Sequence, residues 1–154
     1  MSQSRTTTLA KGVQEEVASY LGAASDLIGV PIVSRRKLNI ASDIAAAVQK
    51  LGVCLYVFPA LPVKIGANAP GPYVDRLLVR VRVIEHPTLN TKGPDAYELV
   101  ELLLRLLDNK QFTAIDGLNP LFFETTPVQP VEDSDELIQF DVVAFTSCGL
   151  TPRS

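Results

Sequence analysis

The chain has 154 residues, of which 47% are hydrophobic and 20% are charged, and its net charge is −3. These values are typical of one globular domain and exclude wholesale disorder. The acidic balance disfavours binding to nucleic acid through bulk charge. One His and two Cys are too few for an ordinary Cys/His zinc site or a disulfide scaffold, and we expect neither a metal nor a cofactor.

Apolar periodicity predicts two helices in the first third of the chain. The first covers residues 8–28, and its core stripe consists of Leu9, Val13, Val17, Leu21 and Ile28. Residues 30–33 follow as a short edge strand, because Pro31 cannot donate to a central ladder. Asn39 is a suitable N-cap for the second helix, over 40–51.

The middle of the chain predicts two strands with a long loop between them. Val53–Phe58 is almost continuously apolar and predicts a buried strand. Residues 64–73 form a Gly/Pro/Asn loop long enough to indicate a functional or mobile segment. Val74–Glu85 alternates between two faces. Leu77, Val79, Val81 and Val83 point one way, and Arg80, Arg82 and His86 point the other.

The last third predicts one helix and two extended segments. Residues 95–108 are apolar over most of the helix circumference, so the sheet and a second surface, either a helix or another subunit, must cover them. Residues 120–131 are predicted to be extended, with Pro127 and Pro130 making the second half an edge or a bulge, and 137–145 forms the last strand. We predict one α+β domain over 1–154, with a mostly antiparallel sheet of four to five strands covered by two to three helices. Residues 1–7 and 149–154 are expected to be frayed.

The lack of recognisable targeting signals and the setting of the two cysteines indicate a compartment. The polar, Ser/Thr-rich N-terminus lacks the apolar stretch of a signal peptide, and no apolar run is long enough to span a membrane. Cys54 and Cys148 lie in or beside apolar strand-like segments, which favours buried, reduced thiols and leaves a disulfide open. These features predict a cytoplasmic protein.

Two arrangements near strand ends could support catalysis. His86, the only His, follows Glu85, and such a pair could act as a base and its orienter. Adjacent strand residues point to opposite faces, however, so a solvated strand end is favoured. Ser147 and Cys148 could supply a nucleophile, but His86 lies far away in the sequence, and a strand end with a buried thiol is favoured.

Two loops could bind ions. The acidic cluster consists of Glu132, Asp133, Asp135 and Glu136. It lacks the glycine and the ligand spacing of a calcium loop, which favours a solvated turn. The glycines at 66 and 71 lack the Lys-Ser/Thr ending of a phosphate-binding loop.

Basic residues form two clusters. Arg35, Arg36 and Lys37 are consecutive, and Arg80 and Arg82 share one strand face. The second pair could bind a carboxylate across the sheet, such as Asp141, or could present a polar face to a partner subunit or a phosphate. The net charge favours protein partners over nucleic acid.

The central stretch carries a family resemblance. The strand beginning at Val79 runs through Glu85-His86-Pro87-Thr88-Leu89-Asn90 and is followed by Gly93 and the leucine-rich helix. Then come Glu124-Thr125-Thr126-Pro127-Val128, an acidic turn and a strand that reaches Thr146. Over about residues 37–148 this order resembles small phage or prophage tail proteins of the tail-terminator or tail-completion kind. The resemblance implies a non-enzymatic α+β subunit that assembles into a homo-oligomeric ring and contacts tail-tube or connector proteins.

The expected partner interface combines the basic clusters with the leucine-rich helix. Its residues are Arg35, Arg36, Arg80, Arg82, Leu99, Leu102 and Leu106. The loops at 64–73 and 109–118 are expected to become ordered on assembly. The expected location is the bacterial cytoplasm during assembly and the virion tail afterwards. Two alternatives remain open: a small enzyme that uses His86 with a carboxylate or thiol, and a nucleic-acid adaptor that uses the arginines.

Overall fold

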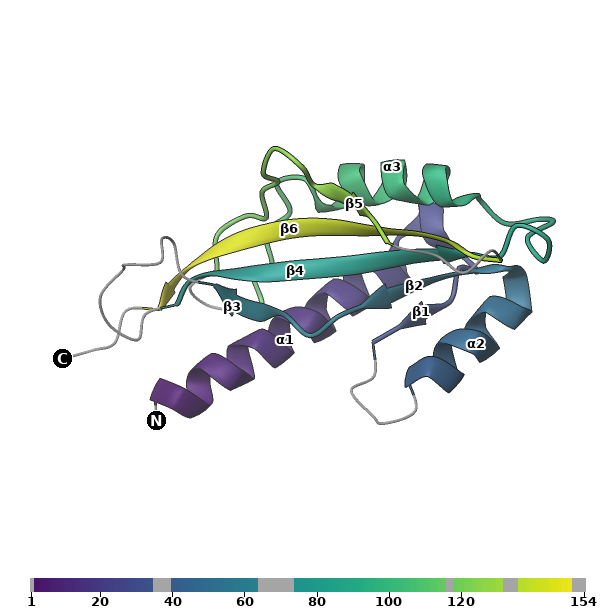
Figure 1. Ribbon diagram of the computed structural model, residues 1–154. Coiled ribbons are helices and arrows are strands. Elements are labelled where there is room, and N and C mark those ends of the chain that lie inside the picture. The colour runs from purple at the N-terminus through teal and green to yellow at the C-terminus, as the bar shows by residue number, and fades with distance from the viewer. Residues whose placement is uncertain (1, 35–39, 64–73, 116–117, 132–135, 151–154) are drawn as a thin grey trace.

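Two long antiparallel strands form the centre of the fold (Figure 1). The computed structural model describes residues 2–34, 40–63, 74–115, 118–131 and 136–150. β4 (Val74–Glu85) and β6 (Ile138–Leu150) pair along their whole length, with a register shift between Val74 and Arg76. Both are rich in β-branched and aromatic residues, which favour the extended backbone.

Shorter strands complete a mixed, six-stranded sheet on both sides of this pair. They are β1 (Ile32–Val33), β2 (Val53–Val57), β3 (Leu61–Val63) and β5 (Val128–Pro130). The strand order is β1-β2-β4-β6-β5, and β3 pairs with the N-terminal half of β4. β1 and β2 are parallel, and the other pairs are antiparallel. The predicted α+β class is confirmed, with more strands than the four to five expected.

The helices divide between the two faces of the sheet. α1 (Ser2–Ala23) and α3 (Ala96–Leu107) pack on one face, which we call the covered face. α2 (Ile40–Leu51) packs on the opposite face, mainly over β1 and β2, and its cluster also includes Ile84 at the end of β4. In Figure 1, β4 and β6 extend well beyond α2. The part of this second face outside α2 is called the open face below.

The main core lies between the covered face and the two helices. The buried strand residues include Leu55, Leu77, Val79, Val81, Val83, Val142 and Ala144. They meet Val13, Val17 and Leu21 from α1, and Ala96, Leu99, Leu103 and Leu107 from α3. The segment 112–123 adds Phe112, Leu118 and Leu121 to the same cluster. The second surface expected for the leucine-rich helix therefore comes largely from the same chain.

Two polar side chains of α1 help to fix it in place. Gln14, only 2% exposed, donates from Nε2 to the carbonyl oxygens of Ser34 at 2.9 Å and Val57 at 3.1 Å. The Tyr20 hydroxyl donates to the Leu106 carbonyl at 2.7 Å. Because these bonds satisfy buried polar groups, they restrict how α1 can sit on the sheet.

The strand-end pattern behind the family resemblance forms a hydrogen-bonded corner between β4 and α3. The buried Glu85 carboxylate accepts from the Ala96 amide at 3.1 Å and from Asn90 Nδ2 at 2.7 Å. The Asn90 side chain also accepts from the Gly93 amide, at 2.9 Å. Asp95 caps the helix by accepting from the Glu98 amide. A carboxylate at a helix N-terminus is favourable, so this corner defines where α3 begins.

Proline accompanies each of the three outer strands among the described residues. Pro31 immediately precedes β1, Pro62 lies inside β3, and Pro130 ends β5, which follows Pro127. A proline has no amide hydrogen to offer to an added strand. The Pro31 carbonyl accepts from the Leu55 amide, so the Pro31 nitrogen faces β2 and not the free edge. The edges at β3 and β5 are therefore the poor templates for further pairing.

Several predicted boundaries need correction. The first helix ends at Ala23, and a 3₁₀ turn (Ser25–Leu27) follows, so Ile28 is not on its core stripe but 80% exposed. β3 was missed because the prolines around it predict a chain break. The last strand continues to Leu150 instead of 145. Residues 2–7 are helical and 149–150 are in β6, so these expected frayed ends belong to regular elements.

Some predictions concern residues outside the described part. These are the N-cap Asn39, the basic turn with Arg35, Arg36 and Lys37, the loop 64–73, the acidic residues 132–135 and the tail 151–154.

Candidate functional site

The strand register arranges the open face in cross-strand rows. Residues directly opposite each other in antiparallel strands share a face. Three successive rows are Tyr56–Arg82–Asp141, Phe58–Arg80–Val143 and Leu61–Leu78–Phe145. Along the strands, the open face thus changes from a charged row to a mixed row and then to an apolar row.

Asp141 is the electrostatic centre of this face. Its side chain is 7% exposed, and it accepts from Arg82 Nε at 2.8 Å and from Arg82 Nη2 at 3.1 Å. This hydrogen bonding raises the pKa of the Arg82 guanidinium, against the opposing effect of burial. The expected pairing of a strand arginine with Asp141 is therefore present, in the bidentate geometry that favours Arg over Lys.

Arg80 is the less satisfied arginine. Its Nε lies 3.9 Å from Asp141 Oδ2, and it donates no hydrogen bond to any described residue. The side chain is 33% exposed, and its guanidinium carbon lies 5.4 Å from the Phe58 ring centre. Because one carboxylate serves two guanidinium groups, Arg80 retains donors for a carboxylate or phosphate of a partner.

The arginines also shield apolar side chains on the open face. The guanidinium carbons of Arg76 and Arg82 lie over the rings of Phe145 and Phe58, at 4.4 and 4.9 Å from their centres. Arg76 Nη1 is 3.3 Å from Glu124 Oε2. Cation–π contact and the apolar stems of these side chains leave Phe145 only 8% exposed.

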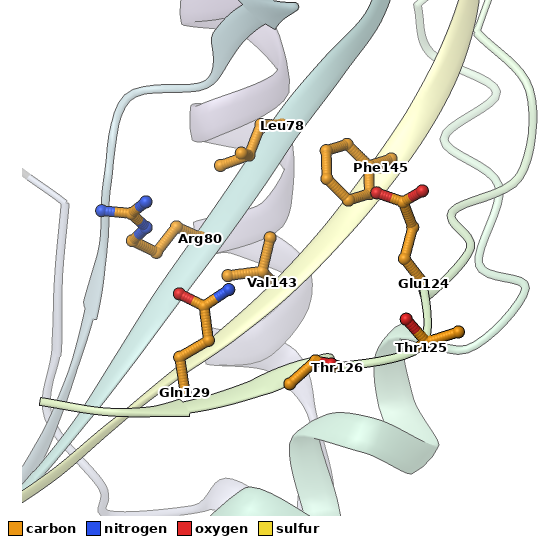
Figure 2. A pocket seen from close by; sticks show the side chains of 8 residues that line it. All are labelled: Leu78, Arg80, Glu124, Thr125, Thr126, Gln129, Val143 and Phe145. Carbon is orange, nitrogen blue, oxygen red and sulfur yellow. The ribbon is translucent and has the colours of Figure 1, made fainter. Parts of the chain in front are cut away.

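A pocket of about 290 Å³ opens on this face beside β5. Leu78, Val143 and Phe145 form its apolar floor, and the segment before β5 forms a polar wall (Figure 2). The lining residues are Leu78, Arg80, Glu124, Thr125, Thr126, Gln129, Val143 and Phe145. Small-molecule sites span about 300–1,000 Å³, so a space of this size suits one or two side chains.

The leucines expected at the partner interface have different positions. Leu99 is 0% exposed within the main core, so it offers no surface to a partner, and its inclusion in the interface was wrong. Leu102 and Leu106 are partly buried and pack against the same core. Of the four arginines, Arg80 and Arg82 lie together on the open face, and Arg35 and Arg36 lie outside the described residues.

The geometry around His86 bears on the enzyme alternative. Its Nε2 is 3.9 Å from Glu136 Oε2, beyond hydrogen-bond distance, and its Nδ1 has no hydrogen-bond partner in the described part of the chain. Glu85 binds the start of α3, and Asp141 binds Arg82. Among the described side chains, none therefore forms a base-and-orienter pair with His86.

The described residues offer little support for a metal site, a reactive thiol or a membrane-spanning helix. The described residues contain no group of three or more His, Cys, Asp and Glu that could hold a metal ion. Cys54 is buried, and its burial raises the pKa of the thiol to about 12. No helix in the described part is long and apolar enough to cross a membrane.

Sequence reasoning missed the apolar part of the open face. A period of two from Arg80 and Arg82 places Leu78 on the same side. The same period from Asp141 adds Val143 and Phe145. The pocket wall had no comparable signal, because residues 124–126 lie outside any strand.

The comparisons with known proteins show the fold alone. No family model and no curated protein matches the chain. Seven chains of solved structures match. One of them, whose name describes no activity or partner, is 17% identical with a TM-score of 0.52, over 92% of this chain and 93% of its own. At this identity, the likeness supports the α+β arrangement over nearly the whole chain.

Proposed function

We propose that this protein is a non-enzymatic structural component of a phage tail or prophage tail-like particle, of the tail-terminator or tail-completion kind. It acts by assembling into a homo-oligomer, a ring in this proposal, and by contacting tail-tube or connector proteins. It is present in the bacterial cytoplasm during assembly and in the virion tail afterwards. The resemblance over residues 37–148 supplies the family.

The open face is the observation that carries the proposal. Among the described residues, a helix covers this face at one end only, and Arg80, Leu61 and part of Leu78 reach solvent beyond it. Arg80 has donors that no described residue uses, and the pocket beside it has an apolar floor. Aromatic residues and arginine are enriched at protein interfaces, where they contribute much of the binding energy.

The prolines at the sheet edges favour subunit contacts through the face of the sheet over contacts made by adding a strand at its edge. Strand addition at an edge extends the sheet through backbone hydrogen bonds, and prolines 62 and 130 remove donors from the edges at β3 and β5. An assembly of defined size needs a closed arrangement of specific contacts. Side-chain surfaces on a rigid sheet meet that need.

Light scattering over a concentration series, with negative-stain imaging of the largest species, tests this function. We expect a discrete oligomer with ring-shaped particles. Arg80→Glu combined with Leu78→Asp should reduce the oligomer without loss of the circular dichroism spectrum. The matched control Glu101→Gln changes an exposed carboxylate on α3, on the opposite side of the sheet. A protein that stays monomeric at high concentration contradicts the proposal.

A further inference from the structure

The turn after α1 carries the most exposed large apolar side chain among the described residues. Ile28 is 80% exposed, whereas the preceding Leu27 is 2% exposed and belongs to the main core. The Val30 amide donates to the Leu27 carbonyl at 3.0 Å, and Gly29 has a φ of +85°. The turn is thus anchored by one side chain while it projects the next one outward.

The same turn also carries an exposed carboxylate. Asp26 is two residues before Ile28, in the same turn. We call the pair Asp26 and Ile28 the knob. An isoleucine at 80% exposure loses its contact with water only when another molecule covers it, and burial of one such side chain contributes about 1.5–3 kcal/mol.

The pocket on the open face has the complementary composition. Its floor of Leu78, Val143 and Phe145 suits a branched apolar side chain, and its volume suits one or two side chains. Arg80 lines the same pocket and donates no hydrogen bond to a described residue. A carboxylate two residues from the inserted side chain would complete the pairing of that arginine.

The knob and the pocket lie on opposite sides of the sheet. The residues around the knob, Leu27 and Val30, belong to the core of the covered face. The pocket opens on the open face. A knob therefore fits the pocket of another copy, not its own. A contact between two different surfaces of identical subunits is head-to-tail, and it closes into a ring when the rotation between subunits permits.

We infer that the knob of one copy inserts into the pocket of the next, with Ile28 on the apolar floor and Asp26 paired with Arg80. This inference rests on the proposed self-association and adds the contact through which it occurs. The partner is a second copy of this chain.

Single substitutions test the contact by analytical ultracentrifugation. Ile28→Ser should raise the dissociation constant about tenfold or more, as expected for an anchor side chain. Leu89→Ser is the matched control, because Leu89 is 38% exposed in the turn before α3, and it should leave the constant unchanged. Asp26→Arg and Arg80→Glu should each weaken assembly, and the double variant with both changes should restore it.

A mixing experiment tests the head-to-tail geometry. Ile28→Arg removes the knob, and Thr126→Trp fills the pocket from its exposed wall. Each variant alone should be monomeric, and a mixture of the two should form a one-to-one dimer, since one functional knob meets one functional pocket. Circular dichroism confirms that both variants are folded.

The outcomes separate this inference from the proposed function. If the native protein assembles and the knob variants assemble equally well, the knob contact is wrong and self-association stands. If the two single variants fail to form a dimer on mixing, the head-to-tail geometry is wrong. If the native protein is monomeric at all concentrations, the proposed function fails first.

Discussion

The pair Asp141 and Arg82 gives the most direct test of the open face. Asp141→Asn keeps the size of the side chain and removes its charge. Two charge-assisted hydrogen bonds, at 2.8 and 3.1 Å, lose their anionic acceptor. Such a bond contributes about 1.5–3 kcal/mol. Arg82 is 26% exposed, so solvent screening lowers the combined effect, and we expect the free energy of unfolding to fall by about 2 kcal/mol.

Urea unfolding monitored by circular dichroism measures this loss, at a protein concentration where the chain is dissociated. The same substitution is then made in an Arg82→Met background, which isolates the pairwise energy. We expect a coupling of about 1–2 kcal/mol. Glu101→Gln, at an exposed helix position, is the control and should change stability little. A coupling near zero, or a loss no larger than that of the control, would refute the reasoning.

Two further predictions concern a tight backbone contact and a buried thiol. Gly52→Ala should destabilise the fold by more than about 2 kcal/mol, because a Cβ there would lie 2.4 Å from the Asn90 amide nitrogen and φ is +91°. Gly22 lies in a helix with open space around it, so Gly22→Ala should instead stabilise the fold by about 0.5–1 kcal/mol. Thermal unfolding compares the two variants. The pKa of the Cys54 thiol is raised to about 12, so in a Cys148→Ser background this thiol should resist a thiol reagent at pH 8 until urea unfolds the protein. Above pH 9 the free energy of unfolding should fall, because only the unfolded chain releases this proton. Rapid labelling in the folded state would contradict the burial of Cys54.

Local signals predicted most of the regular structure. The helix over 40–51 and the strand Val74–Glu85 have the predicted bounds, because Gly52 and Pro87 end them clearly. The leucine-rich helix is one residue shorter at each end than predicted. The face on which each helix packs has no such local signal. It depends on contacts between distant segments, such as Val48 of α2 with Cys54 and Ile84.

The candidate site was predicted in part. Alternation along one strand put Arg80 and Arg82 on the same side, and Asp141 was the expected partner. The leucines were assigned to a partner interface because a helix apolar on most sides needs cover. A single sequence pattern does not show that residues 112–123 return to provide it. Periodicity likewise placed Ile28 on the helix stripe, although the helix ends five residues earlier.

The prolines at the outer strands have a consequence for the life of the free subunit. In the function proposed above, the subunit accumulates before its partners are ready, and crowded chains with bare sheet edges tend to form fibrous aggregates. Prolines 62 and 130 oppose that route at β3 and β5 through a missing backbone donor. Unlike a charged side chain, a missing donor works equally well at any salt concentration or pH. Aggregation through these two edges is therefore opposed whatever the solution conditions.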